Sequence, residues 1–256
     1  MVSGHIGERL FSEKRIAREL RRKGVEMEGF VIRQAGDMAV CVEFGNEVSE
    51  TCNAKAGSFY RSLLAAPVKG LIEAAPAFCT VTVYYDGSVI RYDRFAALLR
   101  KRLLSLKEEK RASGRTIEIP VCYEGDYAPD MMNVSQHTGL SPREIIELHS
   151  GRDYLIYMLG FLPGFPYLGG MDERLSTPRL PAPRVRIEPG SVGIGGKQTG
   201  IYPLASPGGW QLIGRTPVIL YDAKRETPVL YEAGDRIRFV PISKKEFDAL
   251  DERGGN

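Results

Sequence analysis

Residues 160–217 read GFLPGFPYLGGMDERLSTPRLPAPRVRIEPGSVGIGGKQTGIYPLASPGGWQLIGRTP, and this stretch decides the fold of the second half of the chain. Glycine reaches backbone angles that other residues avoid, while proline fixes φ and lacks an N–H donor. An ordinary core segment has no reason to mix the two so densely with aromatic residues. The stretch therefore predicts a succession of turns and close backbone approaches.

Short strands surround and interrupt these turns. The apolar–polar pattern predicts strands at 116–123, 154–161, 184–188, 200–204, 210–214, 218–221 and 236–241. Two helices are expected at 129–137 and 142–149, the second opened by a capping box at Ser141–Glu144 with proline at its first position. Many short strands joined by Gly/Pro turns favour a closed or nearly closed β-barrel over residues 115–242. Ser243 then caps a short helix in the tail, 243–256.

The first half has a different pattern. Strands are expected at 30–33, 38–44, 68–73 and 78–84, and helices at 48–64 and 93–110, with Asp93 as the N-cap of the second helix. This β-β-α-β-β-α order predicts a two-layer α+β domain over 27–110, followed by a charged linker. The fold class is therefore α+β with two domains.

The N-terminal 26 residues form a separate basic segment. Seven lysines and arginines lie between Arg9 and Lys23, and the apolar positions follow a helical period only loosely. We expect a solvated helix or an extension upstream of the folded chain. A helix that binds a membrane surface or a partner is the alternative.

Composition excludes several classes of protein. A chain of 256 residues that is 43% hydrophobic and 26% charged is typical of a soluble globular protein, and no apolar run reaches the ~20 residues of a membrane span. The net charge of +3 gives no footprint of a nucleic-acid binder. Four scattered cysteines and three histidines without ligand spacing predict reduced thiols, a cytoplasmic location and no metal site.

Two segments resemble known binding motifs but lack the features that those motifs require. The run Gly190–Lys197 lacks the spacing of a phosphate-binding loop and leads into a strand. Residues 133–150 imitate a helix-turn-helix, but the second helix would present Glu144 and Glu147 to phosphates. Neither nucleotide binding by the glycine run nor DNA binding is expected.

His149 is the histidine with two competing interpretations. It stands where the second helix ends, so it either interacts with the helix dipole there or acts as a general acid/base in a cleft. The sequence leaves both open.

Polar and aromatic side chains also stand among the glycines. Gln198, Thr199, Tyr202, Trp210 and Gln211 either satisfy exposed backbone or line a ligand groove. Phe165, Tyr167 and Trp210 are either the floor of that groove or plugs of the barrel. Four arginines are either carboxylate clamps or surface charges: Arg179, Arg184, Arg186 and Arg215.

Four blocks in this stretch resemble one known family. They are FLPGFPYLGG at 161–170, GSVGIGG at 190–196, QTGIYP at 198–203 and PGGWQLIGRT at 207–216. In this order they are similar to the KipI / allophanate hydrolase subunit 1 family, which includes the B subunit of bacterial 5-oxoprolinase. The module also resembles half of the carboxyltransferase region of urea carboxylase. The resemblance covers roughly 27–242.

This resemblance implies a cyclophilin-like barrel and a chain that works with partners. It implies a 5-oxoprolinase that opens 5-oxo-L-proline to L-glutamate with ATP hydrolysis at the level of the complex, alongside a second subunit (C-like) and a lactam-opening subunit (A-like). A KipI-type inhibitor of a sensor histidine kinase and an allophanate hydrolase or urea carboxylase subunit are the alternatives; proline isomerisation would rest on fold analogy alone.

Polar side chains set among glycines predict a working surface on the glycine-rich barrel face, where the backbone can approach a ligand closely and donors can converge on it. We expect three catalytic residues, His149, Gln198 and Thr199, and four that bind substrate: Phe165, Tyr202, Trp210 and Arg215.

Overall fold

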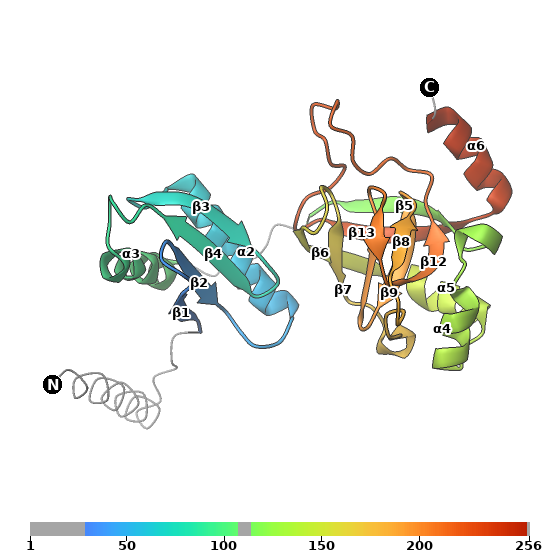
Figure 1. The fold of residues 1–256 in the computed structure, drawn as a ribbon, viewed down its shortest axis with the longest axis horizontal. Helices are drawn as coiled ribbons and strands as arrows, with labels where there is room; N and C mark the ends of the chain where they lie inside the picture. The colour runs from blue at the N-terminus through green and yellow to red at the C-terminus, as the bar shows by residue number, and fades with distance from the viewer. Residues whose placement is uncertain (1–28, 107–113, 255–256) are drawn as a thin grey trace. The chain divides into compact units, whose positions relative to one another are not determined.

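The computed structural model describes residues 29–106 and 114–254 (Figure 1). It divides into two compact units, Met1–Glu109 and Lys110–Asn256. The basic segment 1–26 and most of the expected linker lie outside the described residues.

Over residues 29–106, the first unit is a four-stranded sheet with two helices, in the predicted β-β-α-β-β-α order (Figure 1). Its strands are antiparallel and run in the spatial order β1-β2-β4-β3. The elements are β1 (Val31–Gln34), β2 (Ala39–Glu43), α2 (Glu50–Ala65), β3 (Leu71–Pro76), β4 (Thr80–Tyr85) and α3 (Tyr92–Ser105).

Both helices bury one apolar stripe against the same core. Helix α2 begins after Ser49, whose side chain accepts from the Cys52 amide, and it buries Phe59 and Leu63. Helix α3 buries Phe95, Leu99 and Leu103 in that core. The prediction of Asp93 as N-cap is wrong, because the helix begins one residue earlier and Asp93 lies in its first turn. The carboxylate there still faces the positive end of the helix dipole.

The second unit is a closed seven-stranded barrel, which confirms the predicted fold class. Around the barrel the strands run β10-β7-β6-β13-β5-β12-β9, and only the β5–β13 pair is parallel. The barrel strands are β5 (Thr116–Cys122), β6 (Asp153–Leu159), β7 (Pro166–Gly169), β9 (Ser191–Gly195), β10 (Gln198–Ile201), β12 (Gln211–Arg215) and β13 (Arg236–Ile242). A separate two-stranded sheet joins β8 (Arg184–Ile187) to β11 (Ser206–Gly208).

Among residues 114–254 three α-helices accompany the barrel: α4 (Met131–Thr138), α5 (Pro142–Ser150) and α6 (Lys244–Gly254). Two short 3-10 helices lie at Gly125–Tyr127 and Glu173–Leu175. The predicted capping box of α5 is present, with Ser141 and Glu144 bonded reciprocally. Ser243 and Glu246 make the same exchange at the start of α6. Helix α4 ends at Gly139, whose φ of 74° suits glycine.

The sequence pattern missed three strands and predicted one that is absent. Strands β7, β9 and β11 lie in segments dense in glycine or proline, which are typical of turns. Residues 218–221 form no strand; Tyr221 makes only an isolated bridge to Val229. The local pattern failed at β9 because its glycines are required by the Trp210 indole, which packs against the outer side of the strand.

Within the described residues, no helix is long and apolar enough to cross a membrane.

Candidate functional site

The outer wall of the barrel carries an aromatic face, defined here by Phe165, Tyr167, Tyr202 and Trp210. Phe165 lies at its centre, with ring centroids 5.2 Å from Tyr167, 5.3 Å from Tyr202 and 5.7 Å from Trp210, all edge-to-face. This geometry matches the charge distribution of aromatic rings and adds to their burial. The cluster is separate from the apolar core inside the barrel.

Glycines in β9 and β10 form the floor beneath Trp210. A Cβ on Gly200 would lie 3.2 Å from the indole Cζ3, and one on Gly193 would lie 3.2 Å from Trp210 Cβ. A Cβ on Gly195 would collide with the indole nitrogen and its neighbours. The glycines therefore leave a surface without side chains, and the indole packs directly against the backbone of these strands.

Gln198 and Thr199 are neighbours in β10 but point to opposite sides. Thr199 is fully buried and contacts the interior, and Gly200 meets the aromatic face. Successive residues of a strand alternate between its faces, so Gln198 lies on the outer side with Gly200. Two of the expected catalytic residues are thus divided by the barrel wall.

His149 lies inside the barrel unit, 0% exposed, at the end of α5. Its ring stacks on Phe239 at 4.5 Å and contacts the rings of Tyr123 and Tyr154. Nδ1 lies 2.9 Å from the Tyr123 hydroxyl, and Nε2 lies 2.8 Å from the Thr199 hydroxyl. His149 and Thr199 are therefore brought together, as the sequence predicted, but in the interior.

The hydrogen-bond network assigns one tautomer to His149. The Thr199 hydroxyl donates to the Gly193 carbonyl at 3.0 Å, so its oxygen accepts from His149 Nε2–H. Nδ1 is then unprotonated and accepts from the Tyr123 hydroxyl. The chain Tyr123–His149–Thr199–Gly193 is complete with a neutral imidazole.

Burial strongly disfavours the charged imidazolium. Loss of hydration lowers the pKa of His149 from 6.5 to about 3, with a smaller contribution from the positive charge of Arg152. Desolvation also holds the pKa of Tyr123 well above its ordinary value, so its hydroxyl remains a donor. A residue enclosed and neutral in this way suits a positioning role better than proton exchange with a substrate.

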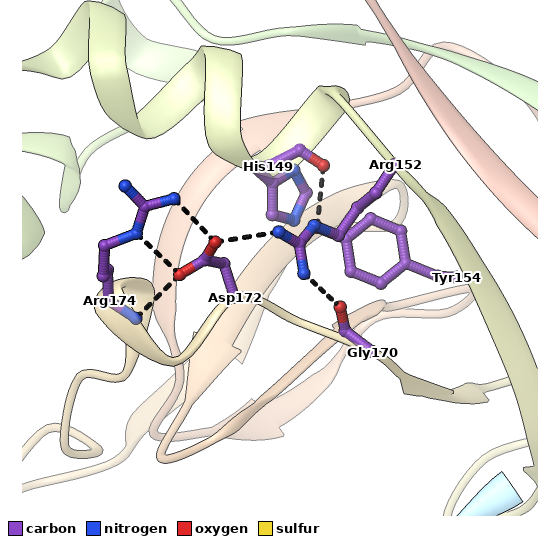
Figure 2. A network of polar contacts seen from close by, with 6 residues as sticks. All are labelled: His149, Arg152, Tyr154, Gly170, Asp172 and Arg174. Atoms are coloured by element: carbon purple, nitrogen blue, oxygen red, sulfur yellow. Dashed lines mark hydrogen bonds and ion pairs between the residues drawn. The ribbon is translucent and has the colours of Figure 1, made fainter.

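An arginine–aspartate network fastens the loop beside His149 (Figure 2). Arg152 donates to the Gly170 carbonyl and to Asp172 Oδ2, both at 2.8 Å. Arg174 reaches both carboxylate oxygens of Asp172. Hydrogen bonds from Arg174 lower the pKa of Asp172 well below its ordinary value, helped by the charge of Arg152. The network ties the end of α5 to the segment after β7.

The four candidate arginines have different environments. Arg184 Nη2 bonds the buried Asp130 carboxylate at 2.6 Å, and Arg186 pairs with Glu188 at 2.7 Å. Arg215 Nε donates to the Pro189 carbonyl at 3.0 Å. Arg179 is exposed and lies over the Trp210 ring, 5.9 Å from its centroid. The aromatic face therefore has Arg179 beside it, whereas the sequence had favoured Arg215.

Phe161 has the most unusual backbone next to this face. Among the described residues it is the only one other than glycine with positive φ, at 65°. The Leu162 amide donates to the Gly160 carbonyl at 2.7 Å, which closes a strained γ-turn around Phe161. Its ring is 63% exposed and stands edge-on to Phe165 at 5.5 Å. The cost of about 1–2 kcal/mol for a side chain in this conformation marks Phe161 as a functional candidate.

The expected substrate-binding residues are thus gathered except for one: Phe165, Tyr202 and Trp210 share the aromatic face, and Arg215 is not part of it. Sequence reasoning missed Tyr123 and Phe161. Tyr123 had a weak signal, since it closes a predicted strand, but its partner His149 is 26 residues away. No group of three or more metal-ligating side chains is found in residues 29–106 or 114–254.

Comparison with known proteins gives a consistent answer. Residues 30–231 match the carboxyltransferase domain, subdomain C and D. The B subunit of the Bacillus subtilis 5-oxoprolinase is 41% identical over 233 residues, covering 87% of this chain and 97% of that protein. The B subunit of the Haemophilus influenzae 5-oxoprolinase is 50% identical over 173 residues, covering 66% of this chain and 79% of that protein.

The fold has a solved counterpart. The crystal structure of the Kluyveromyces lactis urea amidolyase superposes with a TM-score of 0.72 and 21% identity, over 87% of this chain and 15% of that one. At this identity the likeness shows the fold alone. The family match over most of the sequence confirms the resemblance drawn from the four blocks. The chain belongs to the family of the carboxyltransferase domain, subdomains C and D, and its relatives there include the B subunits of bacterial 5-oxoprolinases.

Proposed function

We propose that this chain is the B subunit of a multi-subunit 5-oxoprolinase that converts 5-oxo-L-proline to L-glutamate with ATP hydrolysis. The observation that carries the proposal is the similarity to proteins of that name over nearly their full length. ATP acts at the level of the complex, and the partners are a C-like subunit and an A-like, lactam-opening subunit. The setting is the cytoplasm.

The geometry supports a chain that contributes part of a site. On the aromatic face we propose that Gln198, Tyr202 and Trp210 contact substrate, with Phe165 as their support. His149 and Thr199 act from inside, as positioning residues that hold β10 in register behind Gln198. The buried imidazole gives no exposed acid–base group at this face, so the remaining chemistry belongs to a partner.

The first prediction concerns activity. The purified chain is expected to release no glutamate from 5-oxoproline and ATP, whereas the mixture with both partner subunits is expected to do so, because this chain supplies binding and support alone. A time course of glutamate release by each protein and by the mixture measures this. ATP-dependent release by the isolated chain would contradict the division of labour. A reconstituted complex that turns over an unrelated amide, but not 5-oxoproline, would contradict the function.

The second prediction concerns Phe161. We propose that its exposed ring contacts a partner subunit, since a strained turn that displays an apolar ring to solvent has no benefit within the isolated chain. Phe161→Ala and Phe161→Gly both remove the ring and are expected to weaken complex formation about tenfold or more. Only glycine relieves the positive φ, so Phe161→Gly should be more stable than Phe161→Ala by about 1 kcal/mol.

Calorimetric titration with the partner and thermal melting of the free chain measure the two effects. Met132→Ala is the matched control, because Met132 is equally exposed on α4, away from the turn. Unchanged affinity for the partner in both Phe161 variants would contradict the proposed partner contact. Equal stability of the two variants would contradict the proposed backbone strain.

A further inference from the structure

Trp210 contacts both the glycines of the barrel wall and an arginine. One side of its indole lies against the glycines of β9 and β10, and the guanidinium of Arg179 lies over the ring at 5.9 Å. Such cation–π contacts hold a guanidinium flat while leaving its N–H groups free to bond elsewhere. Arg179 is therefore pre-oriented on the aromatic face.

The charge of Arg179 is not neutralised. Arg184 and Arg186 each pair with a carboxylate, at 2.6 and 2.7 Å, but within the described part of the chain Arg179 has neither an ion pair nor a hydrogen bond, and its contact is with the indole. Its guanidinium offers a planar fork of donors that fits a carboxylate in a bidentate manner. Neighbouring arginines that are already paired do not compete for such a ligand.

Tyr202 supplies a second donor in the same cluster. The residue is 2% exposed and its ring stands 6.2 Å from Trp210, yet its hydroxyl has no hydrogen-bond partner among the described residues. The hydroxyl oxygen is not among the buried side-chain atoms that lack a partner, so it reaches the surface, where a ligand oxygen can accept from it. Burial raises the pKa of Tyr202 to about 12, against the opposing charges of Arg179 and Arg184, so the phenol keeps its proton at neutral pH.

We propose that Arg179, Tyr202 and the rim of Trp210 form a binding site for a small cyclic carboxylate, and that 5-oxoproline is its ligand. The choice of ligand rests on the proposed function. 5-Oxoproline has one carboxylate, which suits the Arg179 fork, and a compact ring with a lactam carbonyl, which suits an aromatic rim and a phenol donor. Recognition of the substrate carboxylate thus belongs to this chain.

The single tryptophan of the chain makes the site directly observable. Because Trp210 is that tryptophan, the intrinsic indole fluorescence of the full chain reports on Arg179 and its ligand. Titration with 5-oxoproline is expected to give a saturable change, and glutamate, which lacks the ring, is expected to bind more weakly. Arg179→Gln should weaken 5-oxoproline binding roughly tenfold or more, since it removes a charge-assisted pair of hydrogen bonds. Tyr202→Phe should weaken 5-oxoproline binding less, because it removes only one neutral hydrogen bond.

Arg186→Gln is the matched control, since this arginine lies on β8 and its guanidinium already bonds Glu188. It should bind like the parent. The site would be overturned if the fluorescence did not change on addition of 5-oxoproline, or if it changed on addition of ATP instead. An equal response to 5-oxoproline in Arg179→Gln and in the parent would also overturn it. Because Arg179 is exposed, its substitution should leave melting unchanged, and a melting scan of each variant verifies this.

Turnover of the reconstituted complex separates this inference from the proposed function. With Arg179→Gln, the KM for 5-oxoproline should rise about tenfold or more while the KM for ATP stays at the parental value. A complex that hydrolyses 5-oxoproline with an unchanged KM in this variant would overturn the site and leave the function standing. Fluorescence binding without any turnover by the complex would leave the site standing and overturn the function.

Discussion

Acidification from pH 6.5 to pH 3 is expected to remove about 4 kcal/mol of the stability of the barrel unit through His149 alone. In the folded chain burial holds the pKa of His149 at about 3, whereas in the unfolded chain it returns to 6.5. Between these values the unfolded chain binds one more proton, so the free energy of unfolding falls as pH falls. The contribution is fully present above the unfolded pKa, and the slope within the window approaches about 1.4 kcal/mol per pH unit.

The range from pH 6.5 to pH 5 is dominated by this residue, because the carboxylates with lowered pKa values titrate mostly below it in the unfolded chain: aspartates such as Asp172 have an ordinary pKa of 3.8, and glutamates such as Glu144 one of 4.5. Urea unfolding followed by Trp210 fluorescence reports on the barrel unit, and it should show a loss of about 1.6 kcal/mol over this range. His149→Gln should flatten the profile, while His137→Gln, on the surface of α4, should keep the parental slope. A parental profile that is flat from pH 6.5 to pH 5 would show that the imidazole is already charged or accessible.

His149→Ala is expected to lower the free energy of unfolding at pH 7 by about 3–5 kcal/mol. The substitution leaves a cavity beside Phe239 and leaves the Tyr123 hydroxyl without its acceptor. Both costs arise in a fully enclosed site, where water is excluded from the lost contacts. Unfolding in urea at pH 7 measures the effect.

His137→Ala provides the surface comparison and should change stability by less than about 0.5 kcal/mol. If His149 exchanged protons with substrate in an open cleft, the order would be reversed: His149→Ala would melt like the parent and the complex would lose turnover. Thr199→Val offers a milder version of the same test, since it removes the hydroxyl that joins His149 to the Gly193 carbonyl.

The sequence predicted the class of fold because periodicity and punctuation are local. In the first unit, alternating and helical patterns coincide with burial on one face, so β2, α2 and α3 lie close to where they were expected. In the second unit, the capping boxes at Ser141 and Ser243 were legible from the letters alone. The four glycine-rich blocks were also sufficient to indicate the family.

The sequence could not decide whether the glycines form turns or a strand surface against which a side chain packs. The run at 190–196 is typical of a loop, yet most of it forms β9, because the indole of Trp210, from a distant part of the chain, needs a surface without side chains. The strand expected at 218–221 failed for the converse reason: its local pattern is strand-like, but no barrel strand pairs with it. The packing of a side chain onto a neighbouring strand is a relation between residues that are not adjacent in the sequence, and no local pattern contains it.

By itself, then, the sequence determined the class of fold, most of the elements and the set of residues with chemical capacity, since these depend on neighbours along the chain. The tertiary structure alone decided which side of the barrel wall each one occupies. It enclosed His149 and Thr199 with Tyr123, and it placed Gln198 on the outer side, where Trp210 and Arg179 lie. The physical reason is that burial and charge pairing set the pKa and the accessibility of a side chain, and both depend on contacts between residues far apart in the sequence.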